Sequence, residues 1–237
     1  MTAGNGSWAE VGTLLIDVLG AVVNESGTLA GQTAAALAEA GADPDHGVAL
    51  AADWNRRTAV MTGQVAAGQA PWRTNDALRR AALLAAVHAA GLSGLPAAVL
   101  DDLALAGYRM APWPDSGPAV AALARSRVVV ALSDASAGQL AAMSATGGLA
   151  WHGVVCAEMT RAYQPDPAVY RTATRVLGLD PGQVMLVAAH PRGLRAAAGH
   201  GLRTAYVARP GQPAPDPGER FDVHTRDLAE LAVLLPG

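Results

Sequence analysis

Short apolar runs alternate along this chain with longer segments whose apolar residues recur at helical spacing. Four runs of aliphatic and β-branched residues predict buried strands at 12–18, 127–132, 184–189 and 204–207, and a shorter run at 152–156 has the same character. Helical spacing lies between and after them, at 118–124, 137–145, 167–177, 194–200 and 225–235. Strands that alternate with helices predict an α/β fold, in which a parallel sheet carries helices on both faces.

The long stretch between the first two predicted strands has no strand pattern. It contains four alanine- and leucine-rich segments of helical spacing, separated by proline and glycine, at 31–40, 48–67, 74–90 and 97–108. We therefore expect two domains: a core of residues 1–26 and 112–237, and a helical cap of residues 27–111. We expect the cap to cover the carboxyl edge of the sheet, because open α/β sheets bind their ligands at that edge.

Composition narrows the range of possible partners. The chain has 237 residues, of which 51% are hydrophobic, and its net charge of −3 argues against a nucleic-acid binder. No apolar stretch is long enough and free enough of charge to span a bilayer, and no basic segment precedes the apolar run 11–23 as it would in a secretory signal. A single cysteine excludes a disulfide framework. We expect a cytoplasmic protein without nucleic-acid or membrane partners.

Polar side chains follow several of the predicted strands at the point where each strand ends. Asp17 closes the first strand, Ser133 and Asp134 follow the second, and His190 follows the run 184–189. Because the carboxyl ends of parallel strands meet at one edge of a sheet, we expect these side chains to lie close together. All 17 basic residues of the chain are arginines, so no lysine can take part in their chemistry.

Four stretches of the chain resemble the motifs of the haloacid dehalogenase superfamily, and in particular its type II 2-haloacid dehalogenase branch. They are residues 16–20, 131–134, 161–170 and 187–197, in the order of the family and at compatible spacing. The resemblance implies a doubly wound, Rossmann-like core with a helical cap after the first strand. It also implies that Asp17 is a nucleophile that displaces halide from carbon and forms an ester, which water then hydrolyses.

The resemblance also implies which other side chains form the site. Ser133 and Tyr170 match family residues, and Arg56 or Arg57 corresponds to a cap arginine that holds the substrate carboxylate. The residues from which we expect substrate contacts are Leu19, Arg56, Asp134, Gln164, Tyr170 and Arg192. Ser133 could instead cap the following helix, and Tyr170 could pack in the core. Because relatives commonly pair through their cap helices, the resemblance further implies a homodimer.

Several positions depart from the family pattern. The hydroxyl residue that follows the nucleophile is Ala21 here, the lysine that pairs with the nucleophile is Gln164, and a second aspartate is Gly193. The serine and asparagine upstream of that aspartate are Ala188 and His190. Loss of the lysine weakens an aspartate as a nucleophile and favours an acid–base role, and Arg192 is the nearest replacement cation that the sequence suggests.

The phosphatase branch of the superfamily needs carboxylates that hold Mg²⁺. In this chain the corresponding positions are Leu19 and Gly193. Mg²⁺ requires several oxygen ligands in octahedral array, which a single aspartate and backbone carbonyls supply poorly. We expect neither a metal nor another cofactor.

Three functions remain open from the sequence, and in the first two we expect Asp17, Ser133 and His190 to be catalytic. One is an enzyme of small-molecule metabolism that has lost the complete hydrolytic site and uses Asp17 for acid–base or electrostatic catalysis. The second is a 2-haloacid dehalogenase that hydrolyses a carbon–halogen bond through an Asp17 ester. The third is a ligand-binding protein without catalytic activity. The expected ligand is a small organic molecule.

Overall fold

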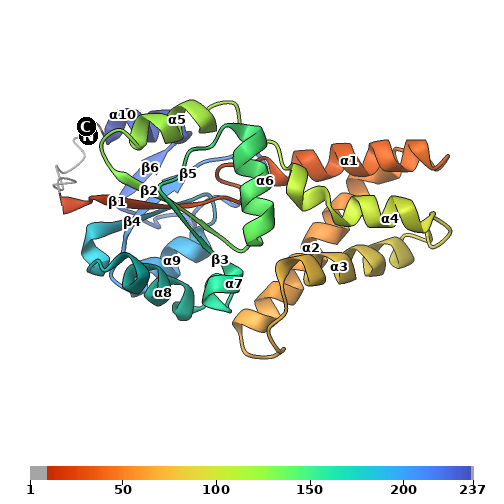
Figure 1. Cartoon of the computed structure of the whole chain (residues 1–237), viewed down its shortest axis with the longest axis horizontal. Helices are drawn as coiled ribbons and strands as arrows, with labels where there is room; N and C mark the ends of the chain where they lie inside the picture. Colours follow the sequence, from red (N-terminus) through yellow and green to blue (C-terminus); the bar gives the residue numbers. More distant parts are fainter. Residues whose placement is uncertain (1–9, 236–237) are drawn as a thin grey trace.

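A computed structural model describes residues 10–235 as a parallel six-stranded sheet with helices on both faces (Figure 1). The strands are β1 (Thr13–Asp17), β2 (Val128–Ser133), β3 (Gly153–Cys156), β4 (Val184–Ala188), β5 (Arg203–Val207) and β6 (Val223–Thr225). They lie in the order β3-β2-β1-β4-β5-β6, and all neighbours pair in parallel. The predicted α/β fold is therefore confirmed. The strand order reverses direction on either side of β1, which is where open α/β sheets place their ligands.

Helices cover the two faces of the sheet unequally. One face packs against α5 (Ser116–Leu123), α6 (Ala137–Gly147) and α10 (Leu228–Leu234), and the other against α8 (Pro167–Leu177) and α9 (Pro191–Gly199). Alternate side chains of β1 enter the two cores, since Leu14 and Ile16 belong to the first and Leu15 to the second. All five residues of β1 are buried, which explains its continuous apolar run. The remaining short helices are η2 (Ala106–Arg109), α7 (Ala157–Thr160) and η3 (Pro181–Gln183).

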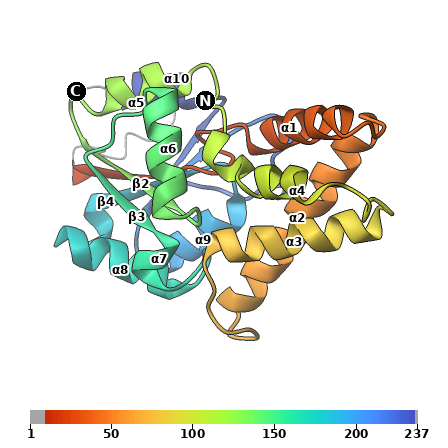
Figure 2. The ribbon, with the colours of Figure 1, turned by 45° about the vertical axis from the view of Figure 1, so that its right-hand side comes forward.

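Four helices between β1 and α5 project beyond the end of the sheet at which β1 ends (Figures 1 and 2). They are α1 (Glu25–Glu39), α2 (His46–Ala66), α3 (Asn75–Ala89) and α4 (Ala97–Ala104). Leu37, Trp54 and Leu83 are buried between them, and the indole Nε1 of Trp54 donates to the backbone oxygen of Arg79 at 2.8 Å. Their apolar interior is continuous with the core on one face of the sheet.

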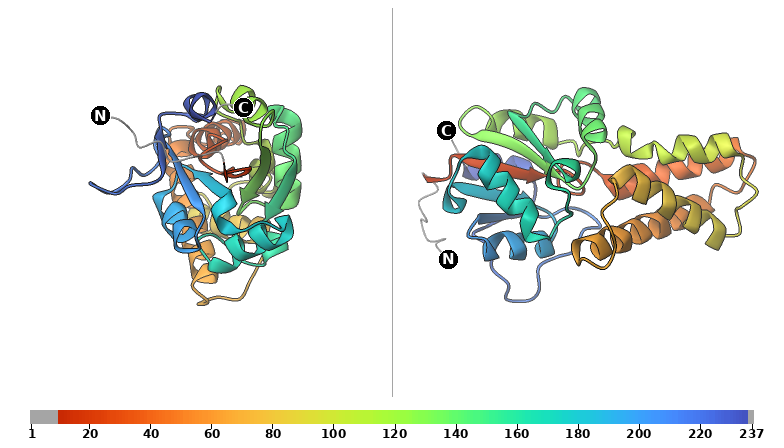
Figure 3. Two further views of the ribbon diagram at one scale, coloured as in Figure 1. Left: turned by 90° about the vertical axis from the view of Figure 1, so that its left-hand side faces the viewer. Right: turned by 60° about the horizontal axis from the view of Figure 1, so that its bottom comes forward.

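The chain leaves the sheet for these helices and returns to it through two segments that lie side by side. The backbone N–H of Asn24 donates to the oxygen of Ala111 at 2.8 Å, and that of Trp113 donates to Val22 at 2.9 Å. In the right-hand view of Figure 3 the four helices extend beyond one end of the sheet. We propose the division into a core of 1–26 and 112–237 and a cap of 27–111 on the strength of these contacts. Residues 1–9 and 236–237 of that core lie outside the described part of the chain.

Some predicted boundaries differ from the structure. The predicted helix 225–235 begins only at Leu228, because residues 223–225 form β6, a strand too short to leave a periodic pattern. Helix α9 begins at Pro191 rather than at residue 194, since the first turn of a helix favours proline. Helix α1 begins at Glu25 rather than at residue 31, because the side chain of Asn24 caps it. None of the helices between residues 10 and 235 is long and apolar enough to cross a membrane.

Candidate active site

Asp17 is the last residue of β1, and its side chain is nearly buried, with 6% of the residue exposed. Its Oδ1 accepts a hydrogen bond from the side-chain Nε2 of Gln164 at 3.2 Å. Its Oδ2 lies 3.5 Å from Nδ1 of His190. The carboxylate is therefore held by one neutral donor and one ionisable ring, which come from two different loops.

His190 is the N-cap residue of α9, directly after β4. Burial lowers the pKa of this histidine, but the hydrogen bond to Asp17 and the negative charge of Asp17 raise it more, so the net shift is upward. The ring packs closely on the backbone of Gly20, where an added Cβ would lie 2.7 Å from Cε1 of His190. Gly20 has a φ of +87°, which only glycine adopts at low cost. A side chain that takes up a proton more readily than a free histidine thus lies beside Asp17, although the chain has no lysine.

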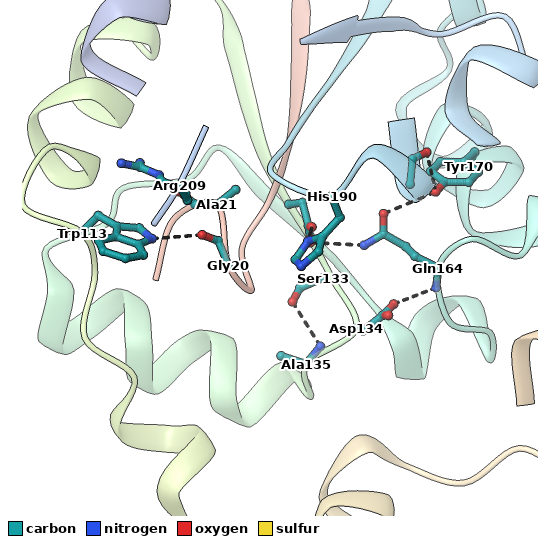
Figure 4. A network of polar contacts seen from close by, with 12 residues as sticks. Gly20, Ala21, Trp113, Ser133, Asp134, Ala135, Gln164, Tyr170, His190 and Arg209 are labelled. Carbon is teal, nitrogen blue, oxygen red and sulfur yellow. Dashed lines mark hydrogen bonds and ion pairs between the residues drawn. The ribbon is translucent and has the colours of Figure 1, made fainter. Parts of the chain in front are cut away.

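The loop after Asp17, residues 18–23, is anchored by two side chains from the core (Figure 4). The indole of Trp113 donates to the backbone oxygen of Gly20 at 3.0 Å, and Nε of Arg209 donates to that of Ala21 at 2.8 Å. Arg209 is also paired with Asp115 at 2.7 Å. These bonds fix the loop through its backbone, so the position of Ala21 needs no hydroxyl for that purpose.

Asp134 follows β2 and is half-buried. Its Oδ1 accepts from the backbone N–H of Gln164 at 2.9 Å. The pKa of Asp134 is raised to about 8: burial is the largest cause and the charge of Asp17 adds to the rise, whereas the backbone hydrogen bond from Gln164 opposes it. At neutral pH this carboxyl group is therefore mostly protonated.

Gln164 is hydrogen-bonded to both aspartates and to Tyr170. Figure 4 shows its contacts with Asp134 and Tyr170. The hydroxyl of Tyr170 donates to Oε1 of Gln164 at 3.4 Å and to the backbone oxygen of Gly193 at 3.1 Å. Burial raises the pKa of Tyr170, so the phenol stays neutral. A Cβ at Gly193 would lie 3.6 Å from Oε1 of Gln164, so any side chain there would adjoin this group. Tyr170 is fully buried and orients Gln164 rather than lining the cavity.

Ser133 is buried and does not line the cavity. Its Oγ accepts from the backbone N–H of Ala135 at 3.1 Å, which stabilises the turn after β2. The cap of α6 is Ser136, whose side chain forms a capping box with Gln139. Ser133 is thus not the cap of α6, which was its alternative role.

A cavity of about 490 Å³ lies between the sheet and the helices α2 and α3. Six of the predicted site residues line it: Asp17, Leu19, Asp134, Gln164, His190 and Arg192. From the helices, Asn55, Thr58 and Asn75 reach the same space. The sequence thus predicted the residues that line the cavity from the ends of the strands, which form its floor. It predicted only incompletely the residues from α2 and α3, which form its roof.

The structure does not bring Arg56 or Arg57, the expected substrate-binding arginines, to the cavity. Neither residue lines the cavity, and both are paired with Asp53, Arg57 through its Nε at 2.6 Å. Adjacent residues of an α-helix point about 100° apart. On α2 this rotation directs Asn55 into the cavity and leaves Arg56 largely exposed.

Arg79 of α3 is an arginine that we did not expect at the cavity. It lines the cavity with a side chain only 2% exposed, and its Nη1 lies 2.7 Å from Oε1 of Glu25. Its guanidinium lies 5.2 Å from the ring centre of Trp54, and its Nε and Nη2 find no hydrogen-bond partner within residues 10–235. A usable signal existed, because residue 79 falls on the same helical face as the buried Ala82, Leu83 and Ala86.

The cations around the cavity are more numerous than we expected, since Arg79 and Arg195 line it together with Arg192. Arg195 is half exposed and paired with Asp216 and Glu219, whereas Arg192 is exposed. In the part of the chain that the structure describes, no group of three or more His, Cys, Asp or Glu side chains could hold a metal ion. Independence from metals stays a prediction that an assay has to test.

Comparison with known proteins gives consistent matches. A family model described as haloacid dehalogenase-like hydrolase matches residues 11–201. A curated (S)-2-haloacid dehalogenase of Xanthobacter autotrophicus is 32% identical over 117 residues, a match that covers 48% of this chain and 46% of that protein. The chain thus spans about half the length of this curated relative.

Two solved structures match over nearly the whole chain. A defluorinating L-2-haloacid dehalogenase is 32% identical with a TM-score of 0.88, and 95% of each chain is covered. Another L-2-haloacid dehalogenase is 34% identical with a TM-score of 0.85, and the match covers 94% of this chain and 97% of the other. The resemblance that the four motifs indicated therefore extends through the sheet and the projecting helices.

Proposed function

Since the chain belongs to the haloacid dehalogenase-like hydrolases, we propose that Asp17 attacks the halogen-bearing carbon of a small 2-halocarboxylic acid. The contact of the Asp17 carboxylate with His190 at 3.5 Å is the observation that carries this proposal. Two relatives that match over almost their full length are L-2-haloacid dehalogenases, at 32% and 34% identity. Their names support the substrate class.

His190 takes over the electrostatic role of the lysine that the family has and this chain lacks. An attacking carboxylate has to be ionised, and a neighbouring positive charge stabilises its ionised form. The pKa of His190 is raised, so a larger share of its rings is protonated near neutral pH than of a free histidine. Gln164 fixes the other carboxylate oxygen without adding charge.

Arg79 and Arg192 supply the positive charge for the substrate carboxylate. Both line the cavity, Arg79 from the cap side and Arg192 from the first turn of α9. An arginine binds a carboxylate with two parallel hydrogen bonds. We propose that this charge draws the 2-halo acid into the cavity with its C2 atom towards Asp17.

This chain has fewer catalytic groups for the hydrolysis of the resulting ester. The positions that supply a lysine, a serine and an aspartate in the family are Gln164, Ala188 and Gly193 here. Loss of positioned acid–base groups slows a step by ~10²–10⁴-fold. We therefore expect the ester at Asp17 to accumulate.

The test is incubation of the protein with (S)-2-bromopropionate. We expect a burst of bromide of about one equivalent per chain, together with a propionate adduct on the peptide that contains Asp17. In the Asp17→Asn variant both signals should be absent. The absence of both bromide and adduct with the wild-type chain would contradict the proposal. Steady turnover would mean that other groups have replaced the missing catalytic groups.

A second function is favoured by the same pair of residues. An aspartate beside a histidine of raised pKa can also move protons without forming a bond to carbon. In that case Asp17 and His190 exchange the C2 hydrogen of a carboxylic acid with solvent. Deuterium incorporation from D₂O that is lost in both Asp17→Asn and His190→Asn, without any adduct, would favour this function over the first.

A further inference from the structure

The cavity holds two carboxyl groups whose surroundings differ sharply. Asp17 has a polar partner on each oxygen, the amide of Gln164 and the ring of His190. Asp134 accepts one backbone hydrogen bond from Gln164 and is paired with no cation among residues 10–235. Both side chains line the same cavity, and Gln164 is hydrogen-bonded to both.

The charged groups around Asp134 favour its neutral form. Burial is the largest influence and raises the pKa of Asp134 to about 8. Asp17 on β1 and Glu25 on α1 add to the rise, while His190 at the start of α9 and the backbone bond from Gln164 oppose it. Tyr163 and Tyr170 are themselves neutral, since burial and the charges of these carboxylates raise the pKa of each phenol. Two carboxyl groups whose surroundings differ in this way can divide the work of nucleophile and acid.

We propose that Asp134 is a catalytic acid that donates its proton to the leaving group while Asp17 attacks. This inference rests on the proposed function of Asp17. In the step, an Asp17 oxygen forms a bond to C2 and the bond from C2 to the leaving group breaks with its electron pair on the leaving group. The proton of Asp134 passes to that group, so the products are the Asp17 ester, the ionised Asp134 and the protonated leaving group.

The role of Asp134 defines the substrate class more narrowly. Bromide and chloride are very weak bases and leave carbon without a proton. Fluoride and oxygen leaving groups are more basic, so a proton donor lowers the barrier to their departure. The structure thus points to 2-substituted carboxylic acids whose leaving group is fluoride or oxygen.

The test compares two substrates under single-turnover conditions. Adduct formation on Asp17 is followed with (S)-2-fluoropropionate and with (S)-2-bromopropionate, in the wild-type chain and in Asp134→Asn. The asparagine keeps the oxygen that accepts from Gln164 but has no acidic proton. We expect the variant to lose ~10²-fold or more with the fluoro acid, and less than about threefold with the bromo acid. Asp101→Asn, which removes an exposed carboxylate of α4 paired with Arg80, is the matched control and should change neither rate.

The outcomes separate this inference from the proposed function. Equal losses with both substrates, or no loss with the fluoro acid, would overturn the role of Asp134 while leaving Asp17 as nucleophile. If the wild-type chain releases no halide and forms no adduct with either acid, the proposed function itself fails and this inference fails with it.

A measurement without any substrate tests the protonation of Asp134. The folded chain keeps this proton up to about pH 8, whereas an unfolded aspartate releases it near pH 4. Wild-type stability should therefore fall relative to that of Asp134→Asn as the pH rises from 4 to 8. A difference in unfolding free energy that stays constant over this range would show an aspartate that is ionised throughout, and would overturn the proposal.

Discussion

Arg79 is a buried cation whose only ionic partner in the described chain is Glu25. Two of its nitrogens lack a hydrogen-bond partner among residues 10–235, so the cap carries a costly charge beside the cavity. This arrangement favours the binding of a substrate at Arg79, because a substrate carboxylate can supply the missing hydrogen-bond acceptors. The same argument does not extend to Arg80, which is half exposed and paired with Asp101 on the surface.

Replacing these two neighbours should have very different effects. We expect Arg79→Ala to lower the free energy of unfolding by about 3 kcal/mol, because it leaves Glu25 without its partner and removes packing from Trp54. Arg80→Ala should cost less than about 1 kcal/mol, since exposed ion pairs contribute little. Urea denaturation of both variants measures the difference. Equal losses would mean that the burial of Arg79 has no energetic consequence.

At this scale the sequence predicted the floor of the cavity well. Asp17, Asp134 and His190 follow strands, and the carboxyl ends of parallel strands necessarily meet. The side chains of the roof depend instead on the rotation of each helix about its axis. Asn55 therefore lines the cavity and its neighbour Arg56 does not, a difference that the positions of the strand ends could not predict.

Helix α6 begins directly after the segment that carries Ser133 and Asp134. Its capping box, in which Ser136 and Gln139 each bind the backbone of the other, determines where that segment stops and the helix starts. Elements of this length were predictable because their periodicity persists over several turns. Strand β6 has three residues and no turn signal of its own, so only the pairing with β5 reveals it.

Loss of the α6 cap should be measurable on its own. We expect Ser136→Ala to lower the free energy of unfolding by about 1 kcal/mol, because the N–H of Gln139 then lacks its acceptor at the buried helix end. Ser93→Ala, at an exposed position between α3 and α4, serves as the control and should be close to neutral. Thermal denaturation of both variants decides the matter, and equal stability would contradict an energetic role of the capping box.

The whole molecule carries apolar side chains on the outside of its cap. Val48 and Val60 on α2 are 64% and 50% exposed, and Leu84 on α3 is 44% exposed. The predicted homodimer would cover such residues, and exposed apolar patches commonly mark contacts between chains. Formation of a homodimer stays a prediction that rests on the resemblance and on these side chains.

Light scattering at micromolar concentration should give the mass of two chains. We expect Leu84→Glu to shift the mass to that of one chain, because a buried charge without a partner opposes association. Val176→Glu changes an equally apolar, 68% exposed position on α8, away from the cap, and should leave the mass unchanged. A single-chain mass for the unaltered protein would contradict the prediction.

The crossing of residues 22–24 with 111–113 makes the helical insertion a closed excursion from the sheet. Its two ends are joined by the hydrogen bonds of Asn24 to Ala111 and of Trp113 to Val22, so the insertion leaves and re-enters the sheet domain at one place. Insertions are tolerated best where both ends lie together at the surface. One stretch of the gene can therefore be exchanged or diversified, and with it the roof of the cavity, while the nucleophile and its neighbours on the sheet keep their positions.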